Sequence, residues 1–243
     1  GNMDYSADKL RQKFYASTAT ALCGMNGRYI EMDYQETLMY GDVMAMAKKK
    51  LNDFTLDIAI GGSINDKVVN STRIDSKNAS LKFANVFNLA NIVMSSSASI
   101  DQKIDAHYQL QSVFATAQAG YKEGVFLDLT ARNDWSSTLA YTKYEKKGFF
   151  YPSIGVSFLP DKWVKMPEWV SFSKLRGAYS IVGNGVPPFI TYPVSYVTAG
   201  GGMLASDAAP FAEMKPEMTH SVELGMEWKF LQHRLGLNLT YYR

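Results

Sequence analysis

Apolar and polar residues alternate with a period of two in segment after segment of this chain, the pattern of β-strands with one apolar face. In the last such segment, Leu235, Leu237, Leu239 and Tyr241 are separated by polar or small residues. The same alternation recurs in residues 221–229, 174–181, 150–158, 125–132 and 54–61. The pattern predicts an all-β fold, an antiparallel up-and-down meander of about eight strands.

The N-terminal part of the chain has a weaker pattern. Residues 36–50 are rich in Met, Ala, Leu and Lys, which favour a helix, but they also suit a strand that turns and pairs with the strand from Phe54. We favour the strand. Residues 10–22 allow a short helix. We therefore expect an ambiguous N-terminal segment over residues 1–35 and β-strands joined by turns and loops over residues 36–243.

The connectors between the expected strands alternate between short and long. Residues 121–124 form a tight turn and residues 230–233 a tight hairpin, whereas residues 183–219 form a long loop rich in Gly and Pro. Alternate connectors of an up-and-down sheet lie at opposite ends, so one end carries short turns and the other long loops. Outer-membrane barrels have this asymmetry, with short periplasmic turns and long extracellular loops.

The two faces of the expected strands differ in charge. The apolar set from Phe150 to Phe158 covers on the order of 20–25 Å, close to the hydrocarbon band of a barrel. The opposite face carries the polar residues that we expect to line the lumen: Asp128, Arg132, Lys174, Arg176, Glu223, Glu227 and Arg234. A charge facing lipid costs about 2–4 kcal/mol at the midplane. The pattern therefore favours part of a transmembrane β-barrel, although a soluble one-sided sheet has the same alternation.

Composition narrows the class of protein. The 243 residues are 47% hydrophobic and 20% charged, with a net charge of +2. This apolar content excludes general disorder, and the balanced charge argues against a nucleic-acid partner. The sequence has no apolar run long enough for a membrane helix, and its single cysteine, Cys23, excludes an internal disulfide framework.

Candidate chemistry is sparse. The three histidines, His107, His220 and His233, are scattered and lack the spacing of a metal site. Glu223 and Glu227 share one strand face but lie about 13 Å apart, too far for a glycosidase pair. We therefore predict a protein that is not an enzyme and that has no catalytic residues, metal or cofactor.

Aromatic residues of the expected loops are the candidate substrate-binding residues. Rings of this kind bind sugars and peptides, but they can equally pack the loop itself. The candidates are Tyr141, Tyr144, Phe189, Tyr192 and Tyr196.

Four blocks of the sequence carry distinctive motifs. Residues 121–139 (YKEGVFLDLTARNDWSSTL) contain a Tyr-rich turn and a strand with Arg-x-Asp, followed by a Ser-Ser pair. Residues 149–158 carry Tyr-Pro-Ser, and residues 169–184 carry a Lys-Leu-Arg strand that ends in Gly-Asn. Residues 215–242 carry a strand pair with Lys-Pro-Glu, Glu-x-Gly and a final Tyr-Tyr. In this order, the four blocks resemble one known family, the SusC/RagA-type TonB-dependent outer-membrane transporters.

This resemblance implies a barrel of about 22 strands around an N-terminal plug. Such a receptor imports glycan or peptide oligomers across the outer membrane of Gram-negative bacteria, with energy from TonB and with a SusD-type surface lipoprotein. This chain is then a fragment of the β-barrel domain. Its partners are outer-membrane lipid and the oligosaccharide or peptide substrate.

Two further expectations follow from the sheet itself. An isolated part of a barrel has two unpaired edges and an apolar face, so we expect it to self-associate. The alternative function is a soluble β-barrel or sandwich that binds a ligand or mediates surface interactions. In that case Leu235, Leu237 and Leu239 would point into a closed core.

Overall fold

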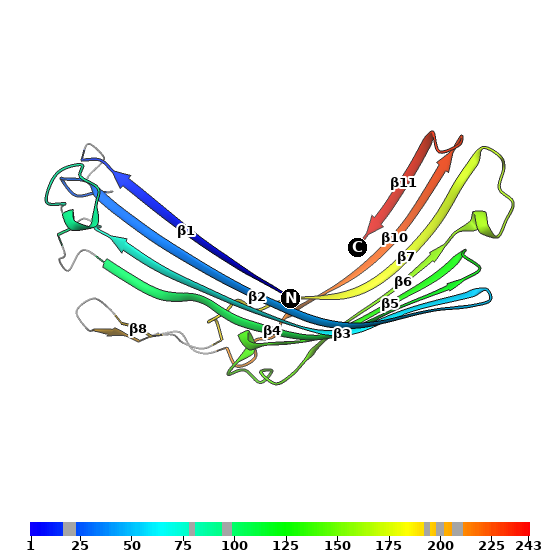
Figure 1. The fold of residues 1–243 in the computed structure, drawn as a ribbon, viewed down its shortest axis with the longest axis horizontal. Helices are drawn as coiled ribbons and strands as arrows, with labels where there is room; N and C mark the ends of the chain where they lie inside the picture. Colours follow the sequence, from blue (N-terminus) through cyan, green and yellow to red (C-terminus); the bar gives the residue numbers. More distant parts are fainter. Residues whose placement is uncertain (17–22, 78–80, 94–98, 192–194, 198–201, 206–210) are drawn as a thin grey trace. The chain divides into compact units, whose positions relative to one another are not determined.

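The fold is a large antiparallel sheet. The computed structural model describes residues 1–16, 23–77, 81–93, 99–191, 195–197, 202–205 and 211–243. Nine strands form one sheet in the order β1-β2-β3-β4-β5-β6-β7-β10-β11 (Figure 1). Among the described residues, β8 and β9 form a separate pair. The predicted all-β meander is confirmed, with nine strands in the main sheet where about eight were expected.

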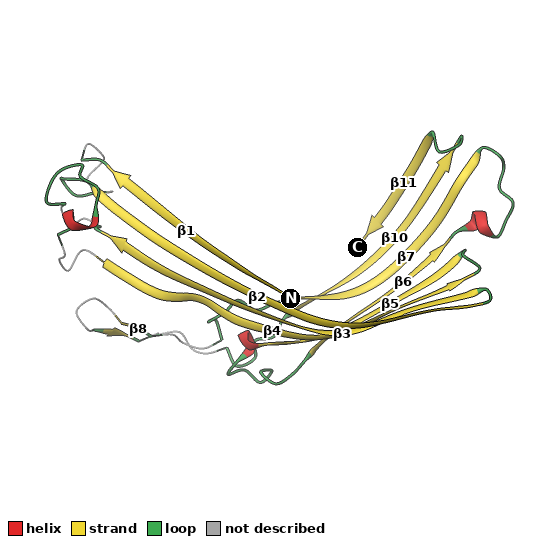
Figure 2. Ribbon diagram, viewed as in Figure 1, coloured by secondary structure: helices red, strands yellow, loops and turns green. Residues whose placement is uncertain are grey.

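Strands account for nearly all of the regular structure (Figure 2). The strands are β1 (Asn2–Phe14), β2 (Arg28–Leu51), β3 (Phe54–Asp75), β4 (Ser99–Tyr121), β5 (Val125–Ser136), β6 (Phe149–Phe158), β7 (Val170–Asn184), β8 (Tyr196–Val197), β9 (Met203–Leu204), β10 (Glu217–Phe230) and β11 (Leu235–Tyr242). In the described part of the connectors, there are three single-turn helices: η1 (Leu89–Asn91), η2 (Ser137–Leu139) and η3 (Pro160–Lys162).

The N-terminal region is also β-structure. The strand expected over residues 36–50 is confirmed as part of β2. The short helix expected from Leu10 is wrong as far as Phe14, because these residues belong to β1, which pairs with β2 from Asn2↔Tyr40 to Phe14↔Arg28. Pairing with a neighbouring strand overrides local helix propensity here. The rest of that expected helix includes residues 17–22, which lie outside the described residues.

β2, β3 and β4 are much longer than their neighbours. They contain 24, 22 and 23 residues, whereas β6 and β11 contain 10 and 8. The tight turn between β2 and β3 places Asn52 at φ 52°, a left-handed conformation that asparagine adopts more readily than most residues. A short turn of this kind fixes the register of the two long strands.

The chain forms two compact units. Unit 1 comprises residues 1–40, 65–109 and 188–212, and unit 2 comprises residues 41–64, 110–187 and 213–243. Unit 1 contains a small core of Tyr29, Leu81 and Ile92. In the described part of unit 2, the buried hydrophobic side chains are Leu139 and Val186, and both lie outside the strands. The sheet of unit 2 therefore has no core of its own.

Candidate functional site

One face of the sheet in unit 2 is continuously apolar from strand to strand. Leu129 is opposite Ile154, Ile154 is opposite Tyr179, and Tyr179 is opposite Val222. Because opposite residues of an antiparallel pair point to the same side of the sheet, the apolar sets of successive strands share one face. Its other members, by the same registers, include Leu127, Val156, Phe158, Leu175, Leu224, Met226, Trp228, Leu235, Leu237, Leu239 and Tyr241.

Much of this apolar face is exposed. Leu235, Leu237 and Leu239 are 58%, 42% and 51% exposed, and Leu224 is 56% exposed. The closed core required by the soluble-barrel alternative therefore does not form around these three leucines in the structure. A contiguous apolar surface of this kind marks contact with an apolar medium or with another protein.

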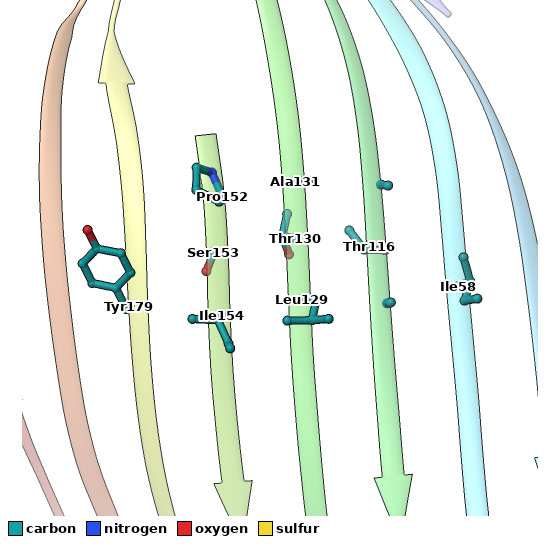
Figure 3. Close-up of a pocket in the computed structure, with 11 residues that line it drawn as sticks. Ile58, Thr116, Leu129, Thr130, Ala131, Pro152, Ser153, Ile154 and Tyr179 are labelled. Atoms are coloured by element: carbon teal, nitrogen blue, oxygen red, sulfur yellow. The ribbon is translucent and has the colours of Figure 1, made fainter. Parts of the chain in front are cut away.

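The apolar face is hollowed where β4 passes between larger side chains. Ala115, Ala117 and Ala131 line a hollow of about 440 Å³, and Ile58 and Ile154 also line it. Figure 3 shows Ile58, Leu129, Ile154 and Tyr179 on separate strands around it. The hollow is an open part of the apolar face, with no charged side chain in its lining.

Aromatic rings collect beside the short turns of unit 2. The ring of Tyr121 lies 4.6 Å from that of Phe54 and 5.5 Å from that of Trp163. Trp169 stacks on Phe230 with 5.6 Å between ring centroids. Aromatic residues are enriched at the interfaces that border the apolar band of a barrel.

The period-two pattern does not identify these aromatic rings, and Trp228 also lies among them. Trp228 lies 6.1 Å from Phe230. Trp163 and Trp169 fall in a connector and follow no strand period, so the alternation gives no signal for them. A cluster of aromatic residues next to several short turns would have been the available clue.

The opposite face of unit 2 carries a network of polar and charged side chains. Asp128 accepts a hydrogen bond of 2.6 Å from Gln118. Arg132 donates to Asp134 at 2.6 Å and to Ser112 at 2.8 Å. The partners lie on neighbouring strands, apart from Asp134, which lies two residues along the same strand. The bonds therefore help to tie β4 to β5.

A second part of the same network links β7, β10 and β11. Arg176 forms an ion pair with Glu223 at 3.1 Å and donates to Thr240 at 2.7 Å. Lys229 pairs with Glu227 at 3.2 Å. Charges on this face are thus mostly matched by neighbours on the same sheet.

The structure places most of the predicted polar set together. Asp128 is opposite Gly155, which is opposite Ala178, and Ala178 is opposite Glu223. By the same registers Arg132, Lys174, Arg176 and Glu227 share this face. Arg234 is the one member of the predicted set that does not lie within a strand; it lies in the turn before β11.

Glycines in β7 and β10 make room for long neighbouring side chains. A Cβ atom at Gly225 would overlap Nε of Arg176, and one at Gly183 would overlap the ring of Tyr151. The Arg176 and Tyr151 side chains therefore lie across the backbone of the adjacent strand.

The predicted ligand-binding aromatics divide among different environments. Tyr141 is 72% exposed, whereas Tyr144 packs against Phe149 at 6.0 Å with Lys147 over its ring. Phe189 is half-buried and belongs to unit 1, whereas Tyr141 and Tyr144 belong to unit 2. Tyr196 begins β8, and Tyr192 lies outside the described residues. Their role in binding stays a prediction.

A buried carboxylate in unit 1 holds the edge strand β1 to β2. Glu31 accepts bonds from Lys9 at 2.7 Å, Arg11 at 3.0 Å and Tyr29 at 2.5 Å. Hydrogen bonds from Lys9 and then Tyr29 and Arg11 outweigh burial and lower the pKa of Glu31 to about 2. The cluster gives β1 a charged anchor in addition to its backbone ladder.

A second buried carboxylate, Asp75, ends β3. Arg28 binds both of its oxygens, at 2.9 and 2.7 Å, and Arg73 binds one at 2.7 Å. Burial raises the pKa of Asp75, but the bonds from Arg28 and from the backbone of Lys77 outweigh it and hold the pKa below its ordinary value. Both carboxylates are structural anchors. In the described residues no three His, Cys, Asp or Glu side chains gather into a metal-binding group.

No helix among the described residues is both long and apolar enough to span a membrane.

Comparisons with known proteins place the chain in a family. A family model described as "TonB dependent receptor-like, beta-barrel" matches residues 2–243. Comparison with curated proteins found no significant match.

Solved structures show the same fold. The chain superposes on the "RagAB peptide transporter" with a TM-score of 0.79 at 17% identity, over 99% of this chain and 27% of that chain. It superposes on the RagAB peptide importer in the 'closed-closed' and 'open-open' states with TM-scores of 0.77, at 18% identity. These matches cover 99% of this chain and 27% and 26% of those chains, so it spans about a quarter of their length.

The family match and the RagAB likeness together confirm the resemblance to SusC/RagA-type barrels. At the identities given above, the likeness to RagAB is one of fold. The chain therefore belongs to the TonB-dependent receptor-like β-barrel family, a family of outer-membrane proteins.

Proposed function

We propose that this chain forms part of the barrel wall of a TonB-dependent receptor that imports peptide or glycan oligomers across the outer membrane of a Gram-negative bacterium. The observation that carries the proposal is the exposed apolar face of unit 2, set against a charged face on the same strands. A barrel wall needs one face for lipid and one for a wet lumen.

The height of the apolar face supports this assignment. On β3, alternate positions from Phe54 to Ile64 are apolar or glycine, and the next residue in the series is Asp66. At about 3.4 Å per residue and a tilt of about 40°, this stretch rises on the order of 25 Å. That rise matches the apolar band of an outer-membrane barrel, and the change to polar residues coincides with the boundary between unit 2 and unit 1.

The charged face is assigned to the lumen by the same argument. Ion pairs such as Arg176–Glu223 would be costly in lipid but are stable where water or a plug domain contacts them. The predicted lumen-facing set, Arg234 included, is part of this proposal. Loop residues such as Tyr141 are the candidate contacts for the incoming substrate.

The partners follow from the family. A receptor of this kind takes energy from TonB, and the similar RagAB structures are described as a peptide transporter and importer. We infer a SusD-type surface lipoprotein as the extracellular partner. Both peptide and glycan oligomers are retained as substrates.

Growth experiments test whether the receptor imports nutrients and whether its substrate is a peptide or a glycan. A strain without the full-length receptor is supplied either with oligopeptides as sole nitrogen source or with a polysaccharide as sole carbon source. The expected result is a growth defect on one of them, which the receptor restores only when TonB is present. Growth that is equal with and without the receptor, or rescue that does not need TonB, would contradict the proposal.

A further inference from the structure

Connectors at one end of the strands of unit 2 are bonded to one another. The amide of Lys122, in the β4–β5 turn, donates to the carbonyl oxygen of Asp53, in the β2–β3 turn, at 2.8 Å. The amide of Leu159, directly after β6, donates to the carbonyl oxygen of Gly124 at 2.7 Å. These bonds join the two turns and the β6–β7 connector into one continuous edge of the sheet.

The β10–β11 turn continues this edge. The amide of Leu231 donates to the carbonyl oxygen of Trp169 at 2.9 Å, and the amide of His233 donates to the hydroxyl of Ser171 at 3.3 Å. All four connectors belong to unit 2, so these bonds fix their places relative to one another. We call the edge that they form the turn rim; it comprises residues 48–54, 121–124, 159–169 and 230–234.

Aromatic rings of the turn rim lie on the apolar side of the sheet. Tyr121 is opposite Val125, and Val125 is opposite Phe158, a member of the apolar face. The ring of Trp163 lies 5.5 Å from that of Tyr121 and is 44% exposed, and Trp169 is 56% exposed. Partly exposed indoles at the end of an apolar face are typical of the boundary between acyl chains and headgroups.

Two lysines lie beside the indole of Trp163. The ammonium of Lys122 is 5.9 Å from the centre of this ring and 5.4 Å from that of Tyr121, a distance at which a ring attracts a cation. Gly124 packs against the same indole, because a Cβ atom added there would overlap the Trp163 ring. That atom would also lie 3.1 Å from Cβ of Lys162. The β4–β5 turn therefore brings Lys122, Lys162 and Trp163 into one cluster.

The turn rim has an excess of positive charge. It contains seven cationic and four acidic residues, whereas the whole chain has a net charge of +2. The cationic residues are Lys48, Lys49, Lys50, Lys122, Lys162, Lys165 and Arg234, and the acidic ones are Asp53, Glu123, Asp161 and Glu168.

Little of this positive charge is neutralised by the chain itself. The ion pairs within the turn rim are long, at 3.7 Å for Lys50–Glu123 and 3.8 Å for Lys122–Asp53. Both join exposed side chains, and such pairs are weak. In the described part of the chain, Lys162 forms no ion pair. These ammonium groups are therefore available to an external anion.

We propose that the turn rim binds the headgroups of anionic phospholipids. The phosphate would contact Lys122 and Lys162 beside Trp163, and the acyl chains would lie along the adjoining apolar face of the same unit. Basic residues beside a membrane surface attract anionic lipids in this way. This inference rests on the proposed function, in which the apolar face meets lipid. Because short turns of outer-membrane barrels are periplasmic, the lipids would belong to the inner leaflet of the outer membrane.

A phospholipid fits the turn rim better than a soluble protein does. The cationic cluster and the exposed indoles directly continue the apolar face, so one molecule with an anionic head and apolar chains satisfies both. A soluble acidic protein would match the cations but would leave the apolar face beyond the rings without an apolar contact.

Photo-cross-linking of lipids to the full-length receptor in vesicles tests the site. Phosphatidylcholine vesicles contain the receptor and a trace of phosphatidylglycerol or phosphatidylcholine with the same photoactivatable acyl chain. Mass spectrometry measures the labelling of residues 159–169. Phosphatidylglycerol is expected to label this segment on the order of tenfold more than phosphatidylcholine, because the lysines attract its anionic headgroup. Sodium chloride is expected to reduce the excess by screening.

A double variant tests the lysines themselves. Lys122→Gln with Lys162→Gln is expected to lower the ratio of phosphatidylglycerol to phosphatidylcholine labelling about fivefold or more. The ratio within one variant cancels differences in peptide detection. Lys146→Gln with Lys147→Gln is the matched control, because both lysines are exposed, lie in the β5–β6 connector at the other end of the strands, and include one above aromatic rings. The control is expected to keep the wild-type ratio.

The outcomes separate the lipid site from the proposed function. The heat-induced shift in gel mobility shows whether each receptor has folded in the vesicles. Folded wild type that both lipids label equally, or a double variant with the wild-type ratio, overturns the lipid site alone. Wild type that does not insert into vesicles overturns both proposals.

Two further results would replace the lipid with another occupant. Loss of the excess in inorganic phosphate, but not in sodium chloride of equal ionic strength, shows a site for free phosphate. Absence of labelling of residues 159–169 by either lipid in folded receptor shows that protein covers the turn rim. Either result overturns the lipid site.

Discussion

Single side chains hold the edge strand β1 to its neighbour. Glu31→Gln removes the charge that Lys9 and Arg11 share and is expected to destabilise the attachment of β1 by about 1–3 kcal/mol. Amide hydrogen exchange in β1 measures the loss. Asp33→Asn is the control, because Asp33 is more exposed and contacts Lys9 at the longer distance of 3.4 Å. Equal effects of both changes would contradict a special role for Glu31.

The same carboxylate gives β1 a defined dependence on pH. The pKa of Glu31 falls from an ordinary 4.5 to about 2 in the folded chain, so its contribution is complete above pH 4.5. Protonation removes the contribution as the pH falls from about 4.5 to about 2. Amides of β1 are expected to lose protection over this range in the wild type and to change less in Glu31→Gln. Identical profiles would rule the linkage out.

A glycine on the charged face tests how closely Arg176 lies against the sheet. Gly225→Ala would push the Arg176 side chain aside and weaken its bonds to Glu223 and Thr240, at a cost of about 1–3 kcal/mol. Gly236→Ala is the matched control, since a Cβ atom added there would meet no other atom within 4 Å. Denaturant unfolding in lipid vesicles compares the two, and equal stabilities would refute the contact.

At the scale of the strand, the two faces should respond in opposite ways to a charge. Leu129→Lys places an ammonium on the apolar face and is expected to cost about 2–4 kcal/mol near the midplane. Thr130→Lys, one residue along β5, places the same charge on the opposite face and is expected to cost much less. Unfolding in vesicles gives both values. Equal costs would mean that the apolar face does not meet lipid.

Strands could be predicted from the sequence wherever one of their faces is apolar, because apolar and polar residues then alternate. The segments of unit 2 were found for this reason. The second half of β3, residues 65–75, was not found. Its sequence after Ile64 begins Asn-Asp-Lys, so neither face of the strand is clearly apolar. The same loss of contrast hid β1, whose place depends on its ladder with β2.

The candidate site was predictable only in part. The polar set from Asp128 to Glu227 follows the period of the strands, so its shared face could be predicted, and the registers give the same face. That this face lines a lumen stays a prediction. Bonds such as Arg176 to Thr240 join residues far apart in the sequence and depend on register, which the sequence does not specify. The hydrogen bonds from Asn91 to the carbonyl oxygens of Phe83 and Val86 depend on loop geometry and leave no periodic signal in the sequence.

At the scale of the whole molecule, the exposed apolar face predicts association of the chain in water. The isolated 27.1 kDa chain is expected to elute in detergent-free buffer as oligomers and to disperse in detergent micelles. Light scattering coupled to size-exclusion chromatography measures both states. A stable monomer of 27.1 kDa without detergent would contradict the prediction.

The order of strands in the sheet sets an order of assembly. Each neighbouring pair from β1 to β7 follows directly in the chain, but residues 185–216 separate β7 from β10. Closing a longer connection costs more chain entropy and slows pairing. We therefore expect hairpins such as β4–β5 to form early and the ladder between β7 and β10 to form late. In a pulse-labelling experiment, the β10 amides that bond to β7 would then gain protection last. Until β10 pairs with β7, the β10–β11 hairpin would have a free edge that could pair with the edge strand of another sheet.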